Sequence, residues 1–191
     1  AFTVKVRGKA SHAGFAPQNG VHAIRIAAAA IAEMAIGRIG DDTTVNVGQI
    51  EGGRASNIVP DYCEVSGELR SFSHKKALEE LAKVEQIFAK EAEKRGGSIE
   101  FIRDICYQAY KTDENESVVK EFQKACTACG IKSSLIATFG GSDQNKMSEH
   151  GIPGIVMASA MHQVHSCQEY TEVSEMAQVA GIVSELLQMK E

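Results

Sequence analysis

The chain has 191 residues, of which 43% are hydrophobic and 24% charged, and its formal net charge is -5 at pH 7. A chain of this length buries about 70% of its unfolded surface, so it can form a core without disulfides or metals. A negative charge without any Lys/Arg-rich run argues against nucleic acid or an anionic membrane surface as the main partner. No apolar run reaches the roughly 20 residues of a membrane span, and no signal-like segment opens the chain, so we expect a soluble protein.

The five cysteines are odd in number and lie in apolar or helical surroundings. This usage fits reduced thiols of a cytoplasmic protein better than a disulfide framework. Cys126 and Cys129 form the one tempting pair, but they continue the apolar stripe of a helical pattern and no second cysteine pair completes a site. We therefore assign them no chemistry.

The first 112 residues alternate between strand and helix patterns. Period-two alternation predicts strands over 2–7, 43–50, 58–69 and 98–110, and helical spacing predicts helices over 21–39 and 75–95. Gly52 and Gly53 mark a hairpin turn, and Ser73 is a suitable N-cap. The order strand, helix, strand, strand, helix, strand predicts a ferredoxin-like α/β domain over residues 1–112.

A polar, turn-rich stretch at 111–117 leads into a second part with a different pattern. There we expect helices over 117–129 and 174–189, a short helix after residue 143, and strands over 134–138 and 154–158. Gly130 is the expected residue after the first of these helices. So few strands make a poor independent sheet, so residues 113–191 are expected to be part of a larger α/β domain.

The first candidate for chemistry is His12, in the turn Gly8-Lys9-Ala10-Ser11-His12-Ala13-Gly14 that follows the first strand. Its small neighbours leave the imidazole open to backbone or substrate, and an imidazole can donate or accept a proton near neutral pH. On the local pattern alone, an ordinary turn explains these residues more simply.

Two candidate groups lie in the second part. His162 and His165 occupy a loop-like segment, where we expect only one imidazole to bind metal, and one imidazole cannot complete a zinc site. Gly140, Gly141 and Ser142 precede a short helix, so their N–H groups could hold a carboxylate or an oxyanion. A polar loop and an N-capping turn remain the simpler alternatives.

Asn57 and Arg70 are weaker candidates. Asn57 lies in the predicted hairpin, and Arg70 lies at the end of its second strand. An arginine can clamp a substrate carboxylate with paired hydrogen bonds, although most arginines at such positions are simply solvated.

Taken together, these residues resemble a known family. The matching motifs are Gly8-Lys-Ala-Ser-His-Ala-Gly14, Pro17, Gly20, Asn46-Val-Gly48, Gly52-Gly53, Ser56-Asn-Ile-Val-Pro60, Arg70, Gly140-Gly-Ser-Asp143, His165-Ser166 and Glu169. In this order they resemble the lid, or dimerisation, domain and the C-terminal end of the catalytic domain of the co-catalytic zinc exopeptidases. That family includes tripeptidase T, carboxypeptidase G and the aminoacylases, and the chain looks closest to the peptidase T-like branch.

The resemblance implies a lid domain over 1–112 and the C-terminal segment of a catalytic domain over 113–191. It implies that the full-length protein is a homodimer through its lid, hydrolyses short peptides and carries two zinc ions in each active site. By the same resemblance, His12 enters the partner's site to stabilise the tetrahedral intermediate, and His165 is a zinc ligand. The implied substrate-binding residues are Asn57, Arg70, Gly140, Gly141 and Ser142.

The chain also departs from this family. The family's other metal ligands, a His-x-Asp motif, a bridging Asp and a Glu-Glu pair, precede the lid and are absent here, since Glu79-Glu80 lies within a helical pattern. We therefore expect the 191-residue chain alone neither to retain zinc nor to hydrolyse peptides. Two alternatives stay open, a non-catalytic dimerisation module and an amidohydrolase that acts on N-acyl amino acids.

Overall fold

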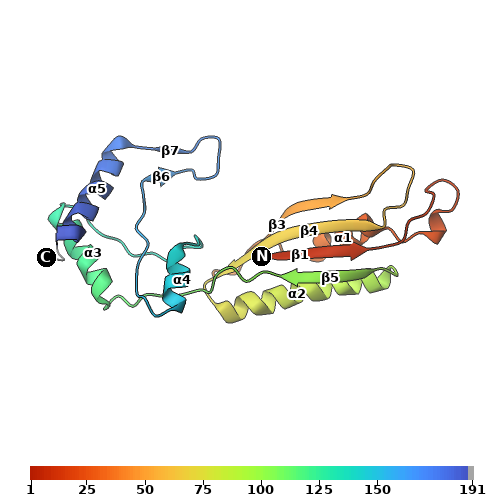
Figure 1. The fold of residues 1–191 in the computed structure, drawn as a ribbon, viewed down its shortest axis with the longest axis horizontal. Coiled ribbons are helices and arrows are strands. Elements are labelled where there is room, and N and C mark those ends of the chain that lie inside the picture. The colour runs from red at the N-terminus through yellow and green to blue at the C-terminus, as the bar shows by residue number, and fades with distance from the viewer. Residues whose placement is uncertain (189–191) are drawn as a thin grey trace. The chain divides into compact units, whose positions relative to one another are not determined.

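The computed structural model describes residues 1–188 (Figure 1). The chain divides into two compact units, Ala1–Ala109, called unit 1, and the chain from Tyr110 onward, called unit 2. No helix within residues 1–188 is both long and apolar enough to cross a membrane.

Unit 1 is an antiparallel sheet with its helices on one face. Its elements are β1 (Phe2–Arg7), the 3-10 helix η1 (Pro17–Asn19), α1 (Ala23–Glu33), β2 (Gly37–Ile39), β3 (Thr43–Gly52), β4 (Tyr62–Ser71), α2 (His74–Lys94) and β5 (Ser98–Arg103). The strand order is β2-β3-β4-β1-β5. Without the short β2, this is the ferredoxin-like arrangement, so the predicted α/β fold is confirmed.

The core of unit 1 lies between the sheet and the two helices. Phe2, Val4 and Val6 of β1 are at most 1% exposed and pack with residues of both α1 and α2. The intervening residues of β1 face the other side of the sheet, where Lys5 lies 3.6 Å from the carboxylate of Glu100. The alternation in the sequence therefore corresponds to one buried and one polar face.

The helix predicted over 21–39 is too long. α1 ends at Glu33, and Gly37 and Gly40, with φ of +94° and +63°, turn the chain into β2 and then toward β3. Apolar residues continue the helical spacing past this end, but the two glycines adopt left-handed conformations that a helix does not contain. The structure also starts β4 at Tyr62 and ends β5 at Arg103, so both strands are shorter than predicted.

Unit 2 contains α3 (Ser117–Ala128), α4 (Asp143–Glu149), β6 (Met161–His162), β7 (Tyr170–Thr171) and α5 (Val173–Gln188). Helices α3 and α5 pack around a small core of Ala125, Cys126 and Ile182. The helix predicted over 117–129 is confirmed, and Gly130 follows it with φ of +70°. Residue 189, the predicted end of the last helix, lies outside the described residues.

The strands predicted over 134–138 and 154–158 are wrong, because neither segment forms a strand. Ile136 and Val156 are 82% and 57% exposed, although their sequence pattern is that of buried strands. A strand requires a neighbour that accepts and donates its backbone hydrogen bonds, and residues 1–188 supply none for these two segments.

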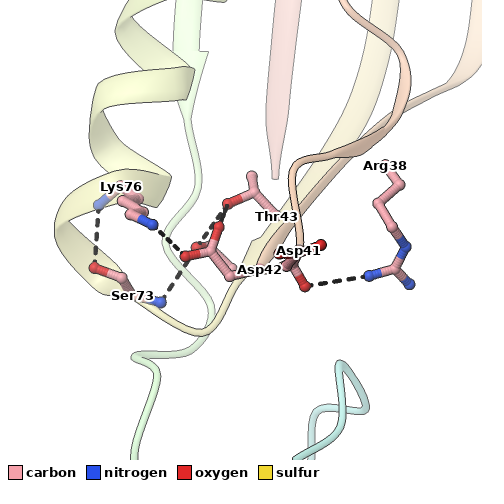
Figure 2. A network of polar contacts seen from close by, with 7 residues as sticks. Arg38, Asp41, Asp42, Thr43, Ser73 and Lys76 are labelled. Atoms are coloured by element: carbon pink, nitrogen blue, oxygen red, sulfur yellow. Dashed lines mark hydrogen bonds and ion pairs between the residues drawn. The ribbon is translucent and has the colours of Figure 1, made fainter.

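A polar network joins the start of α2 to the turn before β3 (Figure 2). The Asp42 carboxylate accepts hydrogen bonds from the Lys76 ammonium and, at 3.1 Å, from the Thr43 hydroxyl. Ser73 caps α2 by accepting the backbone N–H of Lys76. The hydrogen bond from Lys76 is the main cause of a lowered pKa of Asp42, and the same contact raises the pKa of Lys76.

This network predicts an acid-sensitive contribution to stability. Because the pKa of Asp42 is lower in the folded state, its contribution is present above the unfolded pKa of about 3.9 and is lost as the pH falls through the folded value. Urea unfolding should therefore show Asp42→Asn less stable than the wild type at neutral pH, with a difference that narrows in acid. Asp41→Asn is the control, because Arg38 contacts the backbone oxygen of Asp41. A difference that stays constant down to the acid limit would contradict the assignment.

Gly8 lies close to the backbone of Val21, in the chain before α1. A Cβ atom at Gly8 would lie 2.0 Å from the carbonyl oxygen of Val21, which is backbone and cannot move aside. Gly8→Ala should lower the free energy of unfolding by about 1–3 kcal/mol, as overpacking does. Gly48→Ala, whose Cβ would meet no atom closer than 3.7 Å, should change it by less than about 0.5 kcal/mol. Urea unfolding followed by circular dichroism measures both, and equal stabilities would refute the clash.

Candidate functional site

The loop that carries His12 is hydrogen-bonded through its backbone to the segment that carries Asn57. His12 forms an isolated antiparallel bridge with Ile58. The backbone N–H of Ala13 donates to the carbonyl oxygen of Asn57, and that of Val59 donates to Ser11, both at 2.9 Å. Two candidate residues far apart in the sequence are therefore neighbours in unit 1.

The exposed imidazole of His12 has a defined hydrogen-bonding state. Its Nδ1 accepts the backbone N–H groups of Gly14 at 3.1 Å and Phe15 at 3.2 Å. The ring also stacks on the Phe15 ring, with centroids 4.2 Å apart. A nitrogen that accepts two N–H groups carries no proton, so the proton of the neutral ring lies on Nε2. Nε2–H has no partner among residues 1–188, and the ring is a hydrogen-bond donor toward solvent.

Asn57 and Arg70 have different surroundings. Asn57 is exposed, and its side-chain amide has no partner in the described part of the chain. The Arg70 guanidinium lies on β4 and forms a two-point contact with Glu68, at 3.0 Å and 2.9 Å. The contact with Glu68 is not among the sequence-based predictions, although residues two apart on a strand share a face and this spacing could have indicated it.

The structure does not bring Arg70 together with His12 and Asn57. β4 begins at Tyr62, which pairs with Arg7 at the end of β1 that leads to His12. Arg70 lies near the other end of β4, roughly 26 Å from Tyr62 at the usual rise of a strand. The three candidates of unit 1 therefore form two groups at opposite ends of the sheet.

The Gly140–Ser142 loop precedes α4, as the sequence predicts. The backbone N–H of Gly140 donates to the Thr138 hydroxyl at 3.2 Å, and that of Ser142 donates to the Asn145 side chain at 3.0 Å. Within residues 1–188, the N–H of Gly141 has no partner. Of the three N–H groups, Gly141 alone is thus free to meet a ligand.

The two histidines of the β6–β7 hairpin differ sharply. His162 Nε2 lies 2.6 Å from the Glu175 carboxylate, and its ring stacks on Tyr170 with centroids 4.7 Å apart. His165 lies in the turn with φ of +65°, an uncommon conformation for a residue with a side chain. The His165 ring is exposed and has no partner among the described residues, while its backbone N–H donates to Glu169 at 2.8 Å.

A catalytic zinc ion needs three protein ligands and a water. Nowhere in residues 1–188 do three His, Cys, Asp or Glu side chains come close enough to hold a metal ion. The free imidazole of His165 fits one position of such a site, since neutral imidazole nitrogen is a normal zinc ligand. Within residues 1–188, His165 is therefore a candidate for one ligand of a metal site whose other ligands are not assembled there.

Comparison with known proteins shows the family. Residues 1–96 match the peptidase dimerisation domain of the M20 peptidases, and the chain belongs to this family. It is 35% identical over 181 residues to the uncharacterized protein YqjE of Bacillus subtilis strain 168, covering 95% of this chain and 49% of YqjE.

Solved structures of the same family are similar over nearly the whole chain. The aminopeptidase PepT of Bacillus cereus shares 36% identity with a TM-score of 0.84, and a tripeptidase of Staphylococcus aureus shares 31% with a TM-score of 0.89. Each comparison covers 98% of this chain and 50% of the other. The chain thus spans about half the length of the relatives that it matches.

A more distant structure shares the fold alone. It is the YXEP protein of Bacillus subtilis, described as a dinuclear metal-binding peptidase of the M20 family. Identity is 17% and the TM-score 0.69, with 97% of this chain and 48% of that chain covered. Two metal ions are therefore associated with a peptidase of this fold.

The hydrogen bonds of His12 predict its tautomer. Nitrogen-15 NMR of the histidine side chains in the 191-residue protein should show the proton on Nε2 of neutral His12, with Nδ1 as an acceptor. His22 is an internal comparison, because its Nδ1 accepts the backbone N–H of Arg25 at 3.2 Å. The His12→Asn variant assigns the signal. A proton on Nδ1 of His12 would show that the loop does not have this geometry in solution.

Proposed function

We propose that the full-length protein that contains this chain is a zinc-dependent aminopeptidase or tripeptidase of the cytoplasm. The likeness to the aminopeptidase PepT and to a tripeptidase supports short peptides as substrates. In this proposal residues 1–112 are the lid, and residues 113–191 are the C-terminal segment of the catalytic domain. The observation that carries the proposal is the exposed Nε2–H donor of His12, on a loop that is hydrogen-bonded to the segment 57–59.

Peptide hydrolysis passes through a tetrahedral intermediate with a negatively charged oxygen. A donor that is held in place before the reaction stabilises this charge without any reorganisation. The backbone N–H groups of Gly14 and Phe15 fix both the ring and the tautomer of His12. The exposed amide of Asn57 lies on the neighbouring segment and can bind the peptide beside it. His12 is therefore proposed as the oxyanion donor and Asn57 as a substrate-binding residue.

The separation of Arg70 from His12 supports an active site made by two subunits. One lid cannot place both residues around one short peptide, since they lie at opposite ends of the sheet. β5 pairs antiparallel with β1 and ends at Arg103 beside Phe2, so the chain leaves unit 1 at the Arg70 end. We therefore propose that Arg70 contacts the peptide from one subunit, and His12 with Asn57 from the other.

The lid offers a surface for this homodimer. β2 pairs with β3 only through Thr43, Thr44 and Val45, so the rest of that edge of β3 has no strand neighbour among residues 1–188. An unpaired edge is a template for pairing with a second chain. The neighbouring helix α1 exposes small side chains such as Ala28 and Ala32, which permit close approach. A twofold dimer through this edge and α1 is therefore proposed.

When bound in the active site, two zinc ions would supply Lewis-acid chemistry, which would polarise the scissile carbonyl and lower the pKa of a bound water. His165 would hold one of them, and the remaining ligands would come from outside the 191 residues. Gly140, Gly141 and Ser142 would line the site, with the N–H of Gly141 available to the substrate. Within this chain, the work of the other residues is to bind and orient the peptide and to donate to the oxyanion.

Two alternatives lead to different measurements. A non-catalytic dimerisation module would form dimers but hydrolyse nothing, even as the full-length protein with metal. An amidohydrolase would prefer N-acyl amino acids to peptides. Parallel assays of tripeptides and N-acyl amino acids with the zinc-loaded full-length protein distinguish these possibilities.

The decisive experiment is His12→Ala in the full-length protein. Loss of one oxyanion donor typically lowers turnover by about 10² to 10³, and His12 does not contribute to the metal site, so zinc content should stay unchanged. Tripeptide hydrolysis and metal analysis measure the two effects. His22→Asn is the matched control, because asparagine can also accept the N–H of Arg25 and cap α1.

Near-normal turnover of His12→Ala would remove His12 from the mechanism. Parallel loss of zinc would instead indicate a structural role. The 191-residue chain serves as the negative sample, since a single protein ligand does not retain a catalytic zinc. Robust hydrolysis by this chain alone would contradict the proposed division of the active site.

A further inference from the structure

Phe15 is the most exposed of the large hydrophobic side chains in residues 1–188, at 85%. It lies in unit 1 beside His12 and contributes nothing to the hydrophobic core. Burial of an aromatic side chain is favourable, and the folded chain leaves almost all of this contribution unused. The Phe15 ring next to His12 is therefore available for a contact outside this chain.

The backbone around Phe15 holds the ring in place. The N–H of Ala16 donates to the carbonyl oxygen of His12 at 3.0 Å, and the N–H of Phe15 donates to the His12 ring at 3.2 Å. The two rings are nearly parallel, at 20°. One face of Phe15 is thus occupied by His12, and the rest of the ring remains available to a ligand that approaches the imidazole.

We propose that Phe15 is a specificity-determining residue that contacts an apolar substrate side chain next to the scissile bond. This inference rests on the proposed function, in which His12 Nε2–H donates to the oxygen of the scissile carbonyl. The side chains that flank this carbonyl begin only a few bonds from that oxygen. Since the centroid of the Phe15 ring lies 4.2 Å from that of His12, the ring is within reach of a side chain of leucine or phenylalanine size.

The alternative occupant of the Phe15 surface is the second subunit. If His12 enters the partner's site, Phe15 enters with it, and its ring could pack on protein instead of substrate. If Phe15 packs on the partner subunit, Phe15→Ala would change dimer formation, and it would change kcat/KM by the same factor for every substrate. A contact with substrate would change only the discrimination between substrates, because the ring meets a side chain that some substrates lack.

The test uses the full-length zinc-loaded protein and tripeptides that carry Ala, Leu or Phe on either side of the scissile bond. The wild type should have a higher kcat/KM for Leu or Phe than for Ala. Phe15→Ala should reduce this preference about tenfold, which is the size of effect that apolar contacts produce in specificity. Phe15→Leu should keep most of the preference. Ile102→Ala, which shortens an exposed apolar side chain on β5, should keep all of it.

The outcomes separate this inference from the function on which it rests. An unchanged preference in Phe15→Ala would overturn it, as would an equal loss of kcat/KM for every substrate, which indicates that Phe15 only positions His12. Weaker dimerisation with unchanged preference would assign the ring to the subunit contact and would also overturn it. A wild type that hydrolyses no peptide would refute both the proposed function and the assignment of Phe15 as a specificity-determining residue. Loss of activity in His12→Ala, together with a normal substrate preference in Phe15→Ala, would refute the assignment of Phe15 alone.

Discussion

The pairing of β1 on both of its edges is the constraint on which unit 1 depends. β1 lies between β4 and β5, and its inward side chains Phe2, Val4 and Val6 are almost fully buried. A shift of one residue in either register would place these side chains on the polar face and charged residues in the core. The register of β1 therefore also fixes where the chain after Arg7 starts, and with it the position of His12 next to the segment 57–59.

Much of this fold follows from local pattern. Alternation predicts β1 and most of β3, and the apolar spacing with Ser73 as N-cap predicts α2 within a residue. The errors have physical causes. Apolar residues continue past the end of α1, so periodicity alone does not reveal β2. In unit 2, the residue pattern favours strands over 134–138 and 154–158. Residues 1–188 contain no neighbouring strand for either segment, so both are irregular and partly exposed.

The candidate site shows a similar limit. A glycine-rich turn after a strand indicates that His12 is accessible, but its tautomer depends on two backbone N–H groups that only the folded loop aims at Nδ1. The sequence predicts that only one of His162 and His165 binds metal. In the structure their surroundings differ, because the Glu175 carboxylate and the Tyr170 ring contact only His162. The distance between Arg70 and His12 follows from strand pairing, so residue types alone could not indicate it.

The first residue of unit 1 lies beside the chain that follows β5. The backbone N–H of Asp104 donates to the carbonyl oxygen of Ala1 at 3.0 Å, directly beyond the paired ends of β1 and β5. A chain that continued beyond both residues would enter and leave unit 1 through two adjacent connections, as inserted domains do. Both connections therefore lie at the Arg70 end of the sheet, and His12 and Phe15 lie beyond its opposite end, the part of the sheet farthest along the strands from either connection.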